Sequence, residues 1–204
     1  YLLFDNFIGK SIVMKPFLLF LFLPFFSFSQ CLTPSSHYVL SSGNTEGYDR
    51  PRVVITANNS PFVIWSKTTS PKAIKARKWN GTAFDNTVEI VSSDLSPAGF
   101  IGPEIAAKGD TVYLIFESSI HNNHVIYLKR SFDGGLTFSD TIRVSDNSNT
   151  HKFAMPNLTV RADGNPVISY MESTTSWTHW KQMVKTSFDF GTTFSAAVDV
   201  SALA

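Results

Sequence analysis

Short runs of alternating apolar and polar residues, separated by Gly, Asn, Asp and Pro, dominate the chain after residue 45. Runs of this kind predict β-strands, because successive side chains of a strand point to opposite faces. Three stretches repeat the same order of strands and turns, and the prolines that begin them, Pro51, Pro103 and Pro156, are 52 and 53 residues apart. The chain therefore contains an internal repeat, which constrains the fold more than any single strand does.

Each repeat contains four predicted strands that are joined by short turns. Four short antiparallel strands per repeat are typical of a propeller blade. The predicted fold class is therefore all-β, a β-propeller of four-stranded antiparallel blades. The three predicted blades cover about residues 51–92, 103–145 and 156–201.

A further strand is predicted before the first blade. Residues 38–42 resemble the fourth-strand segment at 89–93, and they precede the next anchoring proline by nearly the same distance. We expect this strand to be the outer strand of a final blade, which would close the ring. Propellers typically have about four to eight blades, so the three blades of residues 30–204 are expected to be a fragment of a larger ring.

The turn between the third and fourth predicted strands has the pattern Ser-x-Asp-x-Gly-x-Thr-Phe in the second and third blades, and a shorter, degenerate form at 78–84 in the first. An Asp side chain can accept hydrogen bonds from nearby backbone amides, and Gly allows a positive φ angle. We therefore expect these residues to be structural. They are Ser131, Asp133, Gly135, Thr137 and Phe138, and Ser187, Asp189, Gly191, Thr193 and Phe194.

This pattern, repeated at blade spacing, resembles the Asp box, or BNR repeat, of sialidases and related propellers. The resemblance covers the chain from about residue 38 to its end, and it implies a six-bladed, sialidase-like ring. It also implies that the Asp boxes lie on the face opposite the ligand-binding funnel. The motif thus indicates a fold and leaves the function open.

The N-terminal region predicts export. Residues 14–29 combine a positive start, Met14-Lys15, with an apolar run and small residues before Gln30, which is the pattern of a signal peptide. Residues 1–13 precede this start and are interpreted as an over-extended reading frame. The apolar run is shorter than the roughly 20 residues of a membrane-spanning helix. We therefore expect a secreted or cell-surface protein with no transmembrane segment in its mature chain.

The composition limits the classes of partner that the chain can bind. The chain has 17 Lys and Arg against 16 Asp and Glu with no basic run, which argues against nucleic acid, because binding to phosphates needs a dense cationic surface. Cys31 is the only cysteine, so no internal disulfide can form. Its position after the signal peptide also allows lipid anchoring, although Gln30 is not the small residue that such processing prefers.

By analogy with propellers, ligands are expected at the loops that lead into each first strand and at the loops between the second and third strands. These loops contain Asp49, His124, Lys152 and His179 among their polar residues. Exposed tryptophans stack on sugar rings and anchor partners. His121 and His124 lie in one loop, but no third metal ligand is in view beside them. We therefore expect no metal and no cofactor. The candidate ligand-binding residues are Arg50, Glu117, His121, His151, Glu172, Trp177 and Trp180.

Two functions remain open. A sialidase holds its substrate carboxylate with three arginines, and the first of them would lie two residues before the anchoring proline. Asp49 occupies that position and Arg50 follows it, so no catalytic residue is assigned. The first hypothesis is a non-catalytic propeller that binds a glycan or an extracellular protein. The alternative is an exo-acting, sialidase-type glycoside hydrolase whose remaining catalytic residues lie beyond Ala204.

Overall fold

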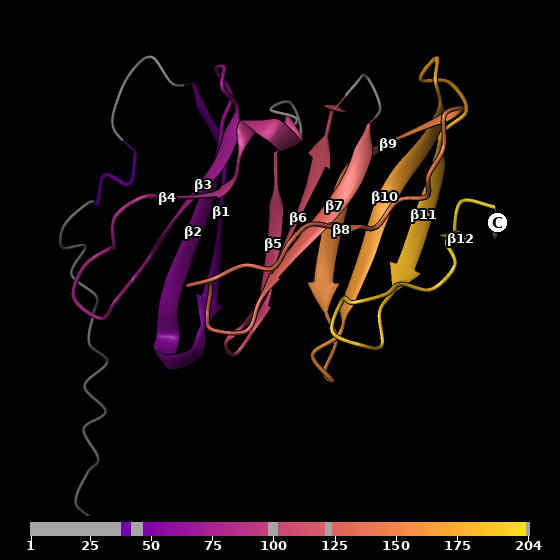
Figure 1. The fold of residues 1–204 in the computed structure, drawn as a ribbon. Coiled ribbons are helices and arrows are strands. Elements are labelled where there is room, and N and C mark those ends of the chain that lie inside the picture. Colours follow the sequence, from indigo (N-terminus) through magenta and orange to yellow (C-terminus); the bar gives the residue numbers. More distant parts are fainter. Residues whose placement is uncertain (1–37, 42–46, 98–101, 121–123, 203–204) are drawn as a thin grey trace, which may run out of the picture. The chain divides into compact units, whose positions relative to one another are not determined.

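The computed structural model describes residues 38–41, 47–97, 102–120 and 124–202, and it contains three four-stranded antiparallel sheets (Figure 1). This result confirms the predicted all-β, propeller-type fold with three blades. No α-helix occurs among the described residues, and the 3-10 helices η1 (Ala57–Asn59) and η2 (Ser93–Leu95) have three residues each. Within the same ranges, no helix has the length and hydropathy needed to cross a bilayer.

In each sheet the strands are hydrogen-bonded in sequence order. Blade 1 consists of β1 (Tyr48–Thr56), β2 (Ser60–Lys67), β3 (Ala73–Lys78) and β4 (Val88–Val91). Blade 2 consists of β5 (Glu104–Lys108), β6 (Thr111–Ser118), β7 (Val125–Ser131) and β8 (Ile142–Arg143). Blade 3 consists of β9 (His151–Val160), β10 (Pro166–Thr174), β11 (Lys181–Thr186) and β12 (Val198–Asp199).

Blades 1 and 3 begin earlier than predicted, because β1 and β9 continue across the anchoring prolines through irregularities in their pairing with β2 and β10. The residue before each proline has a left-handed backbone. The φ angles are +55° at Arg50, +73° at Gly102 and +52° at Met155. The repeat thus includes a backbone feature that a strand pattern does not reveal.

Several predictions for the N-terminal region lie outside the described residues. They concern the segment 1–13, the signal peptide at 14–29, Cys31 and the last residue of the strand predicted at 38–42. Residues 38–40 form no strand, and the Tyr38 ring packs edge-on against Trp79 and Phe84 at centroid distances of 5.3 and 5.7 Å. A ring-closing role for this segment remains a prediction.

The strand β6 explains how the blades pack. Its residues 112–116 are all apolar, without alternation, and both faces of the strand are buried, as in other strands that lie between two layers. Val112, Leu114 and Phe116 pack against blade 1, whereas Tyr113 and Ile115 pack against blade 3. Two apolar seams therefore join the three blades.

Hydrogen bonds from lysines at equivalent positions of the repeat cross both apolar seams. Lys129 Nζ donates to the carbonyl oxygen of Ile90 at 3.1 Å, and Lys185 Nζ donates to that of Val144 at 3.0 Å. In each case a lysine on the third strand reaches the fourth-strand region of the preceding blade. Burial lowers the pKa of Lys129, so this tie has a desolvation cost that the carbonyl must offset.

Glycines of the turns after β7 and β11 allow the blades to approach each other. A Cβ atom on Gly135 would lie 2.7 Å from Phe62, and one on Gly191 would lie 2.9 Å from Leu128. Phe62 and Leu128 are buried side chains of the preceding blade. These positions therefore require glycine for the close contact as well as for the positive φ angle.

We expect Gly135→Ala to reduce the free energy of unfolding by about 2–4 kcal/mol, because it adds overpacking against Phe62 to backbone strain. Gly81→Ala is the matched control. Gly81 also has a positive φ, but no described atom lies within 4 Å of its added Cβ, so the expected loss is about 1 kcal/mol. Urea unfolding followed by fluorescence measures both losses. Equal losses would contradict a role for Gly135 in the seam.

Candidate functional site

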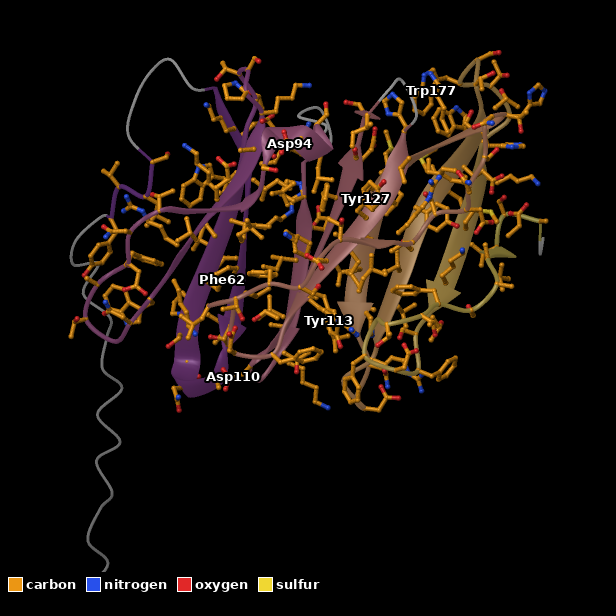
Figure 2. The ribbon with its side chains drawn as sticks, viewed as in Figure 1. Phe62, Asp94, Asp110, Tyr113, Tyr127 and Trp177 are labelled. Carbon is orange, nitrogen blue, oxygen red and sulfur yellow. The ribbon has the colours of Figure 1, made fainter. Side chains whose placement is uncertain are left out.

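The antiparallel order of the strands separates two ends of the blades. The loops between β6 and β7 and between β10 and β11 lie at one end, here called the loop end. The turns after β7 and β11 lie at the other, the turn end, where Gly134 N donates to Asp110 O at 2.8 Å. Trp177 and Asp110 mark these opposite ends in Figure 2.

The two Asp-containing turns have the same hydrogen bonds. Asp133 Oδ1 accepts from Thr137 N at 2.9 Å, and Asp133 Oδ2 accepts from Thr137 Oγ1 at 2.5 Å. Ser131 Oγ donates to Asp133 Oδ1 at 2.6 Å and accepts from Gly135 N at 2.9 Å. In the third blade, Asp189 makes the equivalent contacts with Ser187 and Thr193 at 2.6–2.8 Å. Both carboxylates are thus occupied by their own turns.

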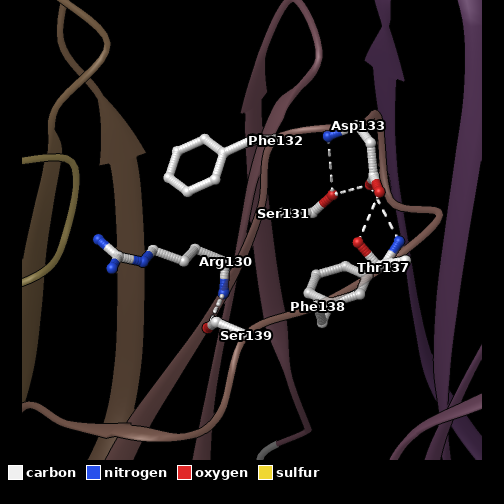
Figure 3. Close-up of a pocket in the computed structure, with 7 residues that line it drawn as sticks. All are labelled: Arg130, Ser131, Phe132, Asp133, Thr137, Phe138 and Ser139. Atoms are coloured by element: carbon white, nitrogen blue, oxygen red, sulfur yellow. Dashed lines mark hydrogen bonds between the residues drawn. The ribbon is translucent and has the colours of Figure 1, made fainter.

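A hollow of about 370 Å³ lies beside the turn of blade 2 (Figure 3). Its polar groups are already bonded within the protein. Arg130 Nη1 donates to Phe190 O at 2.9 Å and to Thr192 Oγ1 at 2.6 Å, which ties blade 2 to the turn of blade 3. Ser139 Oγ accepts from Arg130 N and donates to Asp140 O. The hollow therefore offers few free polar groups to a ligand.

Arg50 lies at the junction of blades 1 and 2, where its side chain packs beside Gly102. Its Nε is 3.6 Å from the carboxylate of Asp49, so the guanidinium already has a neighbouring negative charge. Arg52, which sequence reasoning missed, makes the stronger contact: it binds both oxygens of Glu104 at 2.8 Å from Nε. His121 lies outside the described residues.

Five of the predicted residues lie at the loop end of blades 2 and 3: Glu117, His151, Glu172, Trp177 and Trp180. Glu117 continues the face of β6 that carries Tyr113 and Ile115, so the period of the strand directs it into the seam with blade 3. Its side chain is only 3% exposed. Glu172 similarly shares its face of β10 with Ile168 and Tyr170, which pack in the same seam.

The carboxylate of Glu117 is fully engaged. Glu117 Oε1 lies 2.5 Å from His124 Nδ1, and Oε2 accepts a long hydrogen bond of 3.4 Å from Met155 N on β9. Burial raises the pKa of Glu117, and the contact with His124 opposes that rise. The pair is thus a polar group at the margin of an apolar seam, and it links both blades.

Two tryptophan rings lie beside the Glu117–His124 pair. The rings of Trp177 and Trp180 are stacked, with centroids 5.3 Å apart and planes at 28°. The ring of His124 meets Trp177 edge-on at 4.6 Å, and Lys152 Nζ lies 5.0 Å from the centroid of the Trp177 ring. Trp180 is 41% exposed. We call Glu117, His124, Lys152, Trp177 and Trp180 the seam site.

A second Glu–His pair flanks the seam site. His151 Nε2 lies 3.8 Å from Glu172 Oε1, and His151 Nδ1 lies 3.0 Å from Thr150 Oγ1. No group of three or more metal-ligating side chains occurs in the part of the chain that the structure describes.

Sequence reasoning placed His124 and Lys152 in the loops but did not select them as ligand-binding residues. The sequence feature that could have identified them is their position at the loop end of the strands. His124 immediately precedes β7, seven residues after Glu117, and Lys152 is the second residue of β9. Only the packing of blade 2 on blade 3 brings them to the same indole ring.

Comparison with known proteins supports the fold. No family model matches the chain, and no curated protein matches its sequence. Among solved structures, a Hadza microbial sialidase superimposes with a TM-score of 0.55 at 15% identity, over 72% of this chain and 36% of its own. An endo-1,4-β-xylanase from Bacteroides thetaiotaomicron gives a TM-score of 0.51 at 10% identity, over 81% of this chain and 63% of its own.

At such low identity these similarities show the fold alone. The blades have a sialidase-like propeller arrangement, and the chain spans about a third of the length of the sialidase. Activity and ligand must be argued from the site.

The two turn carboxylates predict a pH dependence of stability. Burial would raise the pKa of Asp133, but its bonds from Ser131 and Thr137 outweigh this effect and lower the pKa to about 2. Bonds from Thr193 similarly lower the pKa of Asp189 to about 2. Since an Asp in the unfolded chain has a pKa of about 3.9, the stabilisation is present above that pH and is lost as the pH falls toward about 2.

We therefore expect an Asp133→Asn, Asp189→Asn double variant to be less stable than the wild type at about pH 7 and to lose less stability between about pH 4 and pH 2. Urea unfolding at both ends of this range measures the difference. Asp94→Asn, at an exposed residue of η2, is the control. An unchanged acid dependence in the double variant would refute the role of these carboxylates.

Proposed function

We propose that the seam site binds a carbohydrate in an extracellular propeller protein. The observation that carries the proposal is the stacked Trp177–Trp180 pair at the loop end, whose outer member is exposed beside charged and hydrogen-bonding groups. An exposed indole offers a flat apolar surface, and the C–H face of a pyranose ring is complementary to it. Lys152 and the nearby histidines can donate hydrogen bonds to sugar hydroxyls.

The distribution of contacts favours Trp180 as the ring that meets the sugar. Trp177 already contacts His124, Lys152 and Trp180, whereas Trp180 retains exposed surface. Two stacked rings also hold each other in place, so less side-chain freedom is lost when a ligand binds.

The proposed extracellular location rests on the predicted signal peptide at 14–29. A glycan-binding propeller fits this location, because the partners of such a domain are present outside the cell. The exo-glycosidase alternative would need Arg50 for a substrate carboxylate. The proximity of Asp49 to the Arg50 guanidinium does not favour that role, because a carboxylate ligand would meet a like charge there.

We expect Trp180→Ala to weaken glycan binding by about 2 kcal/mol, or roughly thirtyfold in Kd, because it removes the stacking surface. The purified full chain is first screened on an array of printed oligosaccharides, and the strongest ligand is then titrated by calorimetry. Phe188→Ala is the matched control, since Phe188 is an aromatic residue of the turn end that is 71% exposed.

The two variants separate site-specific loss from a general loss of surface aromatics. Equal weakening by both variants, or capture of a protein with no glycan binding by the wild type, would contradict the proposal. Release of sugar by the wild type, abolished by Arg50→Ala, would favour the glycosidase alternative.

A further inference from the structure

Glu117 is too enclosed to meet a ligand directly. It is 3% exposed, and its two oxygens contact different partners, His124 Nδ1 and the backbone nitrogen of Met155. The first partner belongs to blade 2 and the second to blade 3. Any effect of Glu117 on binding must therefore pass through the groups that it holds.

His124 is fixed from several sides. Besides its contact with Glu117, its carbonyl oxygen accepts a hydrogen bond of 3.1 Å from Phe153 N on β9. Its ring then meets Trp177 at an interplanar angle of 83°. An edge-to-face contact of this kind depends on the angle of the ring, so the rotation of the imidazole sets where the indole can lie.

The loop that carries the tryptophans has two residues with a left-handed backbone, although Thr174 N and Ser173 Oγ both donate to Thr178 O within it. Trp177 and His179 both have left-handed backbones, with φ angles of +58° and +61°. A bulky residue in this region is strained, and it persists only where its surroundings hold it. Trp177 N donates to Thr174 O at 2.9 Å, and the ring of Trp177 contacts His124, Lys152 and Trp180.

We propose that Glu117 is a positioning residue for the carbohydrate site: it orients His124, and His124 holds Trp177 and thereby Trp180 in the ligand-binding arrangement. The inference takes its ligand, a carbohydrate, from the proposed function. The contacts among Glu117, His124 and Trp177 are present in the protein without a ligand. It also makes the aromatic surface dependent on the docking of blade 2 on blade 3, because the same carboxylate bridges the two.

The test measures tryptophan stacking and ligand binding separately. Two stacked indoles couple their electronic transitions, and the coupling appears as a paired positive and negative band in circular dichroism. In the full chain, Trp180→Ala abolishes this band and defines the baseline. We expect Glu117→Ala to reduce the band by more than half and to raise the Kd for the glycan about tenfold, which corresponds to about 1.4 kcal/mol.

A conservative substitution, a control substitution and a substitution of His124 complete the test. Glu117→Gln retains an oxygen that can accept from His124 Nδ1, so it should restore most of the band and of the affinity. Glu89→Ala, at an exposed glutamate of β4, should change neither. If Glu117→Ala fails to fold, His124→Ala removes the same link from a half-buried residue and should reduce the band in the same way.

The outcomes separate this inference from the proposed function. An unchanged band in Glu117→Ala or His124→Ala would overturn the positioning role. A reduced band in a protein whose wild type binds no glycan would support the positioning role and refute the proposed function. A reduced band with unchanged glycan affinity would show that the site does not depend on this arrangement, and it would overturn the inference as stated.

Discussion

The burial of both faces of β6 is the constraint on which the rest of the structure depends. A strand of this kind must have a sheet packed against each side, and blade 2 buries both faces of β6 between its two neighbours. Close packing of the sheets then requires glycine where the turns meet buried side chains of the preceding blade, at Gly135 and Gly191. It also leaves Lys129 and Lys185 to satisfy carbonyl groups across the seams. The apolar run of one strand thus accounts for the turns and ties that recur around it.

The same constraint produces the seam site. The face of β6 that is apolar at Tyr113 and Ile115 ends in Glu117, because the strand reaches the loop end there. Its charge lies beside blade 3, where His124 and the backbone of β9 provide partners. At the turn end the carboxylates are bonded within their own turns. The two ends therefore differ: one is closed by internal hydrogen bonds, and the other keeps an exposed indole next to polar groups.

Much of the fold could be predicted from the sequence, because strand period, turn chemistry and the spacing of prolines are local signals. These signals gave the three blades and the two Asp turns. They could not give the left-handed residues before the prolines, since Arg50 and Met155 are not residue types that favour this conformation. Trp177 and Trp180 were selected as exposed aromatics, but their stacking depends on the backbone of a strained loop. The contacts of His124 and Lys152 with Trp177 arise only when blades 2 and 3 dock.

The Glu117–His124 pair is difficult to explain by stability alone. Removing a carboxylate from water costs free energy, and a buried polar pair seldom improves on well-packed apolar side chains of similar volume. The raised pKa of Glu117, caused by burial, is a sign of that cost. An apolar residue at this position would have continued the seam, as Ile115 does two residues earlier on the same face of the strand. What the carboxylate provides, and an apolar side chain cannot, is a directional contact that fixes the imidazole and hence the neighbouring indole. The pair is therefore better understood as a cost of arranging the aromatic surface than as part of the core.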